Sequence, residues 1–250
     1  MKKIDIAIVA DFFPPDNKAV AIRMVHLANA LREHDFDVTV YTSKKSKQTR
    51  GYNIRTNVLT PASNKDPVYW RLLKELLFSF ETFVRLLFSN HDYYIVTSPP
   101  FTMAVFATLA LVLRRKKYVI DIRDEYPEVY FEEGLMAPNG LLAVFLRKCE
   151  QMMYKNSMLI TTVTGRIKEK IESKTKGIVD VWLVRNGYAD GFLPVNLKVD
   201  KPFRIVFHGN LGKFQHPTLI ADVARMCLDE RLDVQFDIYG WGANAHQLKD

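Results

Sequence analysis

Two glycine-containing loops and one acidic loop hold the residue types with which this chain of 250 residues could do chemistry. One of them reads His208-Gly209-Asn210-Leu211-Gly212-Lys213. Its two glycines let a ligand approach the backbone closely and Lys213 adds a positive charge, so the loop suits a pyrophosphate. Gly240-Trp241-Gly242 is a second Gly-x-Gly at a strand end, and alone it is a weak signal.

The acidic loop reads Asp121-Ile122-Arg123-Asp124-Glu125-Tyr126-Pro127-Glu128 and follows an apolar run that is typical of a buried strand. It places four carboxylates and one arginine at the carboxyl end of that strand. Such a cluster can orient sugar hydroxyls or hold a general base. A solvated loop with an internal Arg–Asp pair has the same composition, so both interpretations stay open at this point.

Residues 11–19 join the first predicted strand to the first helix, where helix amides and the helix dipole can hold an anion. Lys18 and Arg23 add positive charge to this region. The first glycine of the chain is Gly51, so the loop is neither a dinucleotide fingerprint nor a P-loop. An ordinary strand–helix turn is the alternative. Asn186-Gly187, after a later strand, is a common turn and a weak signal by itself.

No metal site is predicted. Asp35-Phe36-Asp37 matches an Asp-x-Asp motif in letters, but it precedes a strand and therefore belongs to the wrong edge of the sheet. The histidines form no close ligand pair. Cys149 and Cys227 resemble neither a disulfide framework nor a zinc set, which favours a reducing compartment.

Apolar runs and amphipathic segments alternate along the chain, which favours an α/β fold with a doubly wound parallel sheet and helices on both faces. Ligands of such sheets bind beyond the carboxyl ends of the strands. Strands are predicted at 4–10, 38–41, 94–97, 118–122, 159–163, 179–184, 203–207 and 234–239. Helices are predicted at 19–31, 68–88, 101–113, 140–154, 164–173 and 217–228.

A domain boundary is expected near 190–202, giving an N-terminal Rossmann-like domain at 1–190 and the beginning of a second Rossmann-like domain at 191–250. Two strands and one or two helices cannot cover both faces of a sheet by themselves. The second unit therefore packs on the first, or the chain is a fragment of a longer protein, and the fragment is the favoured interpretation.

Positive charge and amphipathic patterns suggest an anionic partner, with a generally basic solvated face as the alternative. The formal net charge is +7, and residues 201–250 contain six Lys/Arg and six Asp/Glu, so the excess lies in residues 1–200. Residues 68–88 form a long amphipathic pattern, and Arg114-Arg115-Lys116-Lys117 follows a second apolar helix. These segments suit either a core helix or docking on an anionic membrane. At 13 residues, 101–113 is shorter than the roughly 20 that span a bilayer.

Taken in order, these segments resemble the GT4 family of retaining glycosyltransferases, which have the GT-B fold of two facing Rossmann-like domains. The resemblance spans the chain and rests on order and spacing. It is carried by Phe12-Phe13-Pro14-Pro15 with Arg23, by Asp121 to Glu128 (the D-x-x-D-x-x-P-E of members that build bacterial surface polysaccharides), by Asn186-Gly187 with Phe192 and Pro194, by 208–213 and by Tyr239-Gly240-Trp241-Gly242.

The resemblance implies transfer of a hexosyl or hexosaminyl group from a nucleotide sugar, a UDP-sugar first of all, with retention and without a metal or other cofactor. It assigns catalytic roles in the acceptor and sugar pocket to Asp124 and Glu128, and acceptor-phosphate binding to Lys18 and Arg23. It assigns donor binding to Asn186, Gly209, Asn210, Gly212, Lys213 and Gly240.

The implied acceptor is a polyprenyl-diphosphate-linked sugar or a polysaccharide, and the implied location is the cytoplasm, in peripheral contact with the inner face of the cytoplasmic membrane. No nucleic-acid partner is expected, because the aromatic residues lie at helical core spacing. Two departures weaken the expected activity: the first loop lacks the usual glycines, and the family's Glu-x7-Glu segment would follow residue 250. The 250 residues alone are therefore expected to be weak or inactive.

Two other functions fit the same sequence. A nucleotide-sugar epimerase of the same fold would need no membrane affinity. A non-catalytic α/β module that binds anionic ligands would account for the charge and the loops without chemistry.

Overall fold

The computed structural model describes residues 3–15, 18–43, 51–59, 67–187, 202–211, 217–242 and 245–248. The chain divides into two compact units, Met1–Gly187 and Tyr188–Asp250, and each is described by itself. The domains predicted at 1–190 and 191–250 stay a prediction, because residues 188–201 lie outside the described part of the chain.

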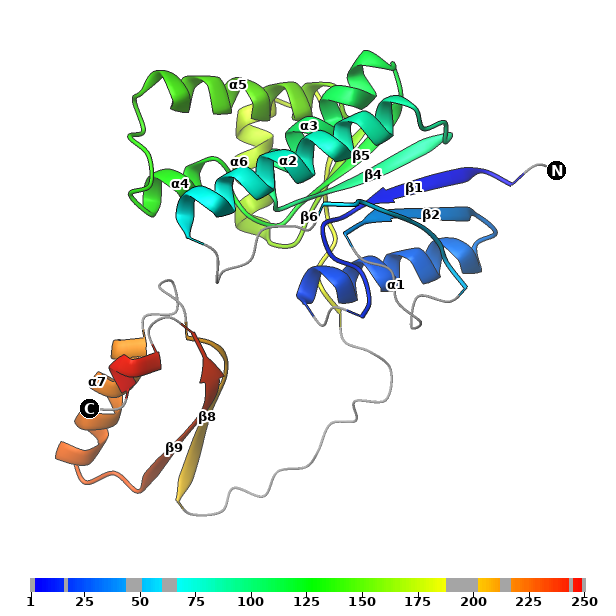
Figure 1. Ribbon diagram of the computed structural model, residues 1–250. Coiled ribbons are helices and arrows are strands. Elements are labelled where there is room, and N and C mark those ends of the chain that lie inside the picture. The colour runs from blue at the N-terminus through cyan, green and yellow to red at the C-terminus, as the bar shows by residue number, and fades with distance from the viewer. Residues whose placement is uncertain are drawn as a thin grey trace. The chain divides into compact units, whose positions relative to one another are not determined.

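The first unit is built on a seven-stranded parallel sheet (Figure 1). Its strands are β1 (Asp5–Val9), β2 (Asp37–Thr42), β3 (Asn53–Thr56), β4 (Tyr93–Ser98), β5 (Lys117–Ile122), β6 (Leu159–Thr162) and β7 (Val181–Leu183). Their order is β3-β2-β1-β4-β5-β6-β7, so the direction of winding reverses between β1 and β4. In doubly wound sheets this switch point opens a crevice at the carboxyl ends of the strands.

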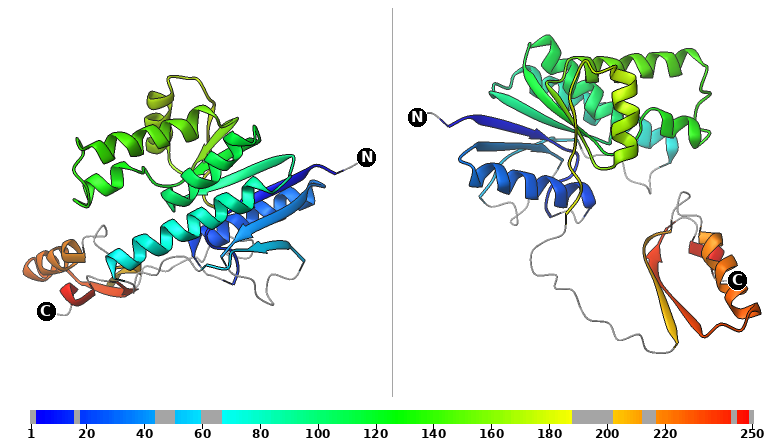
Figure 2. Two further views of the ribbon diagram at one scale, coloured as in Figure 1. Left: turned by 45° about the horizontal axis from the view of Figure 1, so that its top comes forward. Right: turned by 180° about the vertical axis from the view of Figure 1, so that it is seen from behind.

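Helices cover both faces of the sheet, as the sequence predicts (Figures 1 and 2). One core joins α1 (Ala19–Glu33) to β1 and β2, and a larger core lies between the other face and the remaining helices. Those helices are α2 (Val68–Leu87), α3 (Phe101–Leu113), α4 (Glu128–Glu132), α5 (Leu141–Lys155) and α6 (Gly165–Thr175). The α/β fold class is therefore confirmed.

The apolar helix α3 is a core element. Ala104, Ala107 and Ala110 are completely buried among α2, α5 and the strands, which explains why this helix has no polar face. Thr164 caps α6, since its hydroxyl accepts the Ile167 N–H at 3.3 Å. Within the described residues, no helix is long and apolar enough to cross a bilayer.

Two elements of the first unit are absent from the sequence prediction. Strand β3 is a short edge strand with Ile54 as its single buried residue, so it lacks a continuous apolar run. Helix α4 begins at the last residue of the acidic loop, covers about one turn and a half and buries no side chain completely, so it has no periodic signal.

The second unit contains a parallel pair, β8 (Phe203–Asn210) and β9 (Val234–Trp241), with α7 (Pro217–Asp229) and a short 3-10 helix, η3 (Ala245–Leu248). The strands run further than the sequence predicts. His208, Gly209 and Asn210 belong to β8 rather than to the following loop, because they pair in register with Tyr239, Gly240 and Trp241 of β9.

Candidate functional site

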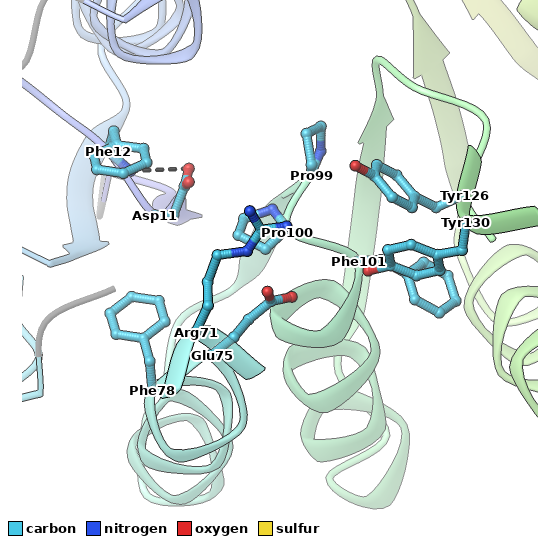
Figure 3. A pocket seen from close by; sticks show the side chains of 10 residues that line it. All are labelled: Asp11, Phe12, Arg71, Glu75, Phe78, Pro99, Pro100, Phe101, Tyr126 and Tyr130. Atoms are coloured by element: carbon cyan, nitrogen blue, oxygen red, sulfur yellow. Dashed lines mark hydrogen bonds between the residues drawn. The ribbon is translucent and has the colours of Figure 1, made fainter. Parts of the chain in front are cut away.

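A pocket of about 180 Å³ lies at the switch point between β1 and β4 (Figure 3). The loop after β1, the first turns of α2, the β4–α3 connection and the acidic loop each supply part of its wall. Its lining residues are Asp11, Phe12, Arg71, Glu75, Phe78, Pro99, Pro100, Phe101, Tyr126 and Tyr130. The side chains point from several elements toward one space, which is the position at which this fold binds ligands.

Asp11 supplies this pocket with a carboxyl group whose pKa is unusually high. The residue is 6% exposed, and its Oδ1 accepts the Phe12 N–H at 3.0 Å. Burial raises the pKa of Asp11 to about 7, although the positive charges of Arg123 and Lys18 oppose the shift. Asp11 therefore changes its charge near neutral pH, a property that suits a general base acting on a hydroxyl.

Three aromatic rings form the opposite wall. The ring centroids of Tyr126 and Tyr130 lie 4.8 Å apart, and Phe101 stacks on Tyr126 at 6.1 Å. Burial, helped by the negative charges of Asp124, Glu133 and Glu75, raises the pKa of Tyr126 to about 12, so its hydroxyl is a neutral donor and acceptor at physiological pH. A flat apolar wall facing a few polar groups suits a small ring that carries hydroxyls.

Helix α2 adds the charged floor of the pocket. Arg71 and Glu75 lie one turn apart on its inner side, and Glu75 accepts the hydroxyl hydrogen of Thr102 from the first turn of α3. Behind the pocket, Arg123 donates through Nη2 to the Pro99 carbonyl oxygen at 3.1 Å, while its buried Nε has no partner within the described residues.

Arg23 is part of a buried ion pair, and its expected contact with an acceptor phosphate stays a prediction. Its Nε and Nη2 donate to the two carboxylate oxygens of Asp121 at 3.0 and 2.7 Å, and the side chains are 12% and 2% exposed. Thr161 donates to the same carboxylate at 2.7 Å. Arg23 also donates through Nη1 to Asn186 Oδ1 at 3.1 Å, so the structure brings together two residues that the sequence placed in different roles.

The two carboxylates expected to be catalytic lie outside the pocket. Asp124 is more than a third exposed, and partial desolvation raises its pKa while Arg123 opposes the shift. Glu128 sits on α4 between Arg147 at 3.3 Å and Lys174 at 3.0 Å. Partial burial favours the neutral form of Glu128, but these cations outweigh it and hold its pKa below the ordinary value. In the described geometry Glu128 forms ion pairs with Arg147 and Lys174, and its catalytic role stays a prediction.

Lys18 lies at the entry to α1, with its Nζ 3.2 Å from the centroid of the Phe12 ring. Phe12 lines the pocket, so Lys18 is next to the site without being one of its lining residues. Its predicted contact with an acceptor phosphate is untested. Within the described residues, no cluster of three or more His, Cys, Asp or Glu side chains could hold a metal ion.

Two of the glycines that are expected to bind the donor lie opposite each other on the two paired strands of the second unit. Gly209 and Gly240 are register partners in β8 and β9. A Cβ on Gly240 would lie 2.2 Å from the Gly209 carbonyl oxygen, so packing alone requires a glycine there. Gly212 and Lys213 lie outside the described residues, as does the side chain of Asn210. The donor-binding roles of these residues remain predictions.

Replacing Gly240 by alanine is expected to destabilise the second unit by about 1–3 kcal/mol, because the new methyl group collides with backbone that has no rotamer to yield. Gly209→Ala is the matched control, since its Cβ would meet nothing closer than the Phe207 ring at 3.6 Å. Hydrogen exchange of the β8 and β9 amides measures both variants. Equal protection in the two would contradict the close approach.

The sequence missed Asp11, Arg71, Glu75 and Tyr130 as pocket residues. Asp11 lies in a loop that the sequence did single out and Tyr130 lies just beyond the acidic loop, whereas Arg71 and Glu75 belong to a helix interpreted as a core or membrane-docking helix from its amphipathic pattern. The signal that could have found them is an Arg–Glu pair at i and i+4 in the first turns of a long amphipathic helix.

The fold and the pocket define a class of protein: a Rossmann-like sheet with a ligand crevice at its switch point, as in GT-B glycosyltransferases. Residues 20–190, more than half of the chain, match the family described as Glycosyltransferase Family 4, and the chain belongs to that family. The resemblance inferred from the motifs is thus confirmed at the level of family and fold. No curated protein matches the chain.

Solved structures agree on the fold. The catalytic domain of Starch Synthase IV from Arabidopsis thaliana, bound to ADP and acarbose, has a TM-score of 0.59 at 12% identity, over 100% of this chain and 70% of that chain. The apo lipopolysaccharide outer core galactosyltransferase WaaB has a TM-score of 0.54 at 15% identity, over 98% and 63%. A putative UDP-N-acetylglucosamine 2-epimerase from Listeria monocytogenes has a TM-score of 0.53 at 15% identity, over 95% and 62%. The chain thus spans less than two thirds of the last two proteins.

Proposed function

We propose that this protein acts in glycosyl transfer, moving a hexosyl or hexosaminyl group from a nucleotide sugar to an acceptor bound in the pocket of the first unit. The observation that carries the proposal is the pocket itself, in a chain of Glycosyltransferase Family 4. Asp11 offers a carboxylate to an acceptor hydroxyl, and Phe101, Tyr126 and Tyr130 offer a surface for a sugar ring.

The donor is proposed to bind through the second unit, with Lys213 and the backbone near Gly209 at the diphosphate and with retention at the anomeric carbon. Backbone amides and a lysine can stabilise a leaving diphosphate without a metal. The neighbours support a nucleotide donor, since one of the similar structures contains ADP and another contains UDP. A UDP-sugar is the first donor to test.

The acceptor is proposed to be lipid-linked or a growing polysaccharide of the cell surface, used by a peripheral protein at the cytoplasmic face of the membrane. Support comes from the net charge of +7 and from the likeness of the fold to a lipopolysaccharide galactosyltransferase. The exposed apolar residues of α2 and the nearby run Arg114–Lys117 add to this support.

A UDP-sugar is expected to raise the melting temperature of the protein, and Lys213→Ala is expected to remove that increase. Differential scanning fluorimetry with UDP-glucose, UDP-galactose and UDP-N-acetylglucosamine measures the effect, because a ligand of the folded state stabilises it by mass action. Lys201→Ala is a control of equal charge change. Undiminished protection of Lys213→Ala would remove Lys213 from the donor site.

Epimerisation is the second candidate, because the fold likeness includes a putative UDP-N-acetylglucosamine 2-epimerase. An epimerase converts its UDP-sugar without an acceptor, whereas a transferase releases UDP in proportion to glycosylated acceptor. Incubation with UDP-N-acetylglucosamine and nuclear magnetic resonance of the sugar protons separates the two. A C2-epimeric product formed without acceptor would replace the proposal of transfer.

A further inference from the structure

Helix α2 has an outer face that points away from the core and is almost wholly apolar. We define this outer face as Trp70, Leu73, Leu76, Leu77, Phe80 and Val84, which are between 36% and 54% exposed. They recur at helical spacing and form one stripe. On the opposite side of the same helix, Phe78 and Leu86 are 1% exposed.

This distribution is the reverse of an ordinary surface helix, whose outer face is charged. The core of the first unit already satisfies the inner side of α2, so packing within the unit does not account for the outer face. A continuous apolar stripe of this kind on a protein surface marks an interaction site. The figures show α2 running along the outside of the helical layer, next to α3 (Figures 1 and 2).

Positive charge adjoins one end of this stripe. Arg114 donates through Nη1 to the Leu87 carbonyl oxygen at 2.6 Å, which places the run Arg114–Lys117 against the last residue of α2. On α2 itself, Glu81 is neutralised by Arg85, whose Nη2 lies 2.8 Å from Glu81 Oε1. Apolar side chains flanked by cations complement an anionic bilayer, which offers acyl chains beside phosphate headgroups.

The inner side of α2 lines the pocket. Arg71, Glu75 and Phe78 form one wall of it, and each is next in sequence to an outer-face residue of the same helix. A helix with its side chains is about 10 Å across. A surface bound to the outer face therefore lies about one helix diameter from the space that the pocket encloses.

We propose that α2 is the wall between a lipid surface and the acceptor pocket: its outer face and the run Arg114–Lys117 dock on an anionic membrane, and the pocket receives a sugar carried by a lipid in that membrane. The docking stands on the surface alone, whereas the delivery of a lipid-borne acceptor rests on the proposed function. Docking with α2 along the headgroup region keeps the pocket beside the headgroups without any helix crossing the bilayer.

Vesicle binding tests the docking. The full chain is sedimented with vesicles of phosphatidylcholine alone or mixed with phosphatidylglycerol. Binding to the mixed vesicles is expected to fall at least about tenfold in Leu77→Glu/Phe80→Glu, since burying charge in the interface is costly. Leu219→Glu/Leu228→Glu is the matched control, because these leucines of α7 are 62% and 77% exposed and lie outside the surface. Circular dichroism checks that each variant is folded.

A second variant isolates the charge. Arg115→Gln/Lys117→Gln is expected to lower the affinity for mixed vesicles about tenfold or more and to leave the weak binding to phosphatidylcholine unchanged. Equal binding by the outer-face variant and its α7 control would overturn the docking. So would a dimer in sedimentation velocity that Leu77→Glu/Phe80→Glu dissolves, because a second copy would then cover the face.

Transfer assays test the delivery separately. With a polyprenyl-diphosphate sugar in mixed vesicles, Leu77→Glu/Phe80→Glu is expected to raise the apparent KM about tenfold, while kcat and KM for a short-chain soluble analogue stay unchanged. Equal loss with both acceptors would overturn the delivery and leave the vesicle result standing. If the unaltered protein transfers to neither acceptor, the proposed function fails, and the docking is judged by sedimentation alone.

Discussion

Replacing Asp11 by asparagine is expected to make the protein more stable at pH 8 and less active. The pKa of Asp11 in the folded protein is about 7, against an ordinary 3.8, because burial disfavours the carboxylate. Between these two values the folded chain holds a proton that the unfolded chain has released. The free energy of unfolding therefore falls as pH rises from about 4 to 7 and is constant above that window.

The size of this effect follows from the shift. A shift of about three pKa units corresponds to up to about 4 kcal/mol. The free energy of unfolding is lower by this amount at pH 8, because the folded protein must then bury a carboxylate. The amide side chain of Asp11→Asn has no proton to lose, so denaturant unfolding is expected to show the variant more stable at pH 8, and the difference is expected to shrink to about 1 kcal/mol at pH 4.5. A pH-independent difference would contradict the buried carboxylate.

The same substitution is expected to lower transfer by about 10- to 100-fold, because a hydroxyl loses a hydrogen bond to a charged acceptor. The activity of the unaltered protein is expected to decline below pH 7, where Asp11 becomes protonated, and the variant lacks this inflection. Glu128→Gln is the comparison. Its side chain is held by Lys174 and Arg147 outside the pocket, so its pH profile is expected to keep the inflection.

Removing Arg23 is expected to destabilise the protein by about 3–5 kcal/mol. Arg23→Ala leaves the carboxylate of Asp121, 2% exposed, with Thr161 as its remaining side-chain donor within the described residues. A buried charge without its partner costs far more than an exposed pair contributes. Urea unfolding measures the loss.

The control for this pair is Arg147→Ala, which breaks a pair with Glu128 whose side chains are 38% and 27% exposed, and it is expected to cost about 1 kcal/mol or less. The double variant Arg23→Ala/Asp121→Ala is expected to lose less than the sum of the single variants, because each single variant leaves a charge stranded. Additive losses would show that the two side chains do not depend on each other.

Local pattern predicts most of the fold. The mainly apolar runs of β1, β4 and β5 and the mainly apolar stretch of α3 are predicted correctly, because elements buried on both sides are dominated by apolar residues. The edge strand β3 is missing from the prediction because only one of its four residues, Ile54, is buried, so the strand has no apolar run. The carboxyl ends of β8 and β9 are not predicted as strand, because glycines in a sequence indicate a turn. Here Gly209 and Gly240 instead let the two strands approach closely.

The site is less predictable than the fold, because its chemistry depends on partners distant in sequence. Asp121 is neutralised by Arg23, 98 positions away, and Glu128 by Lys174, 46 positions away. No spacing rule connects such residues before the sheet order is known. Asp11 lies in a loop that the sequence singled out for its cations, yet its own importance arises from burial, which composition does not show.

The small side chains of α3 give the pocket a remote means of adaptation. Ala104, Ala107 and Ala110 are wholly buried, so a bulkier residue at any of them must displace α2, α5 or the strands, and α2 has the largest contact with α3. Because α2 carries Arg71 and Glu75, a displacement of α2 changes the width of the ligand space without altering any residue that touches the ligand. Related chains could thus diverge in the size of molecule they accept while keeping an identical set of lining residues.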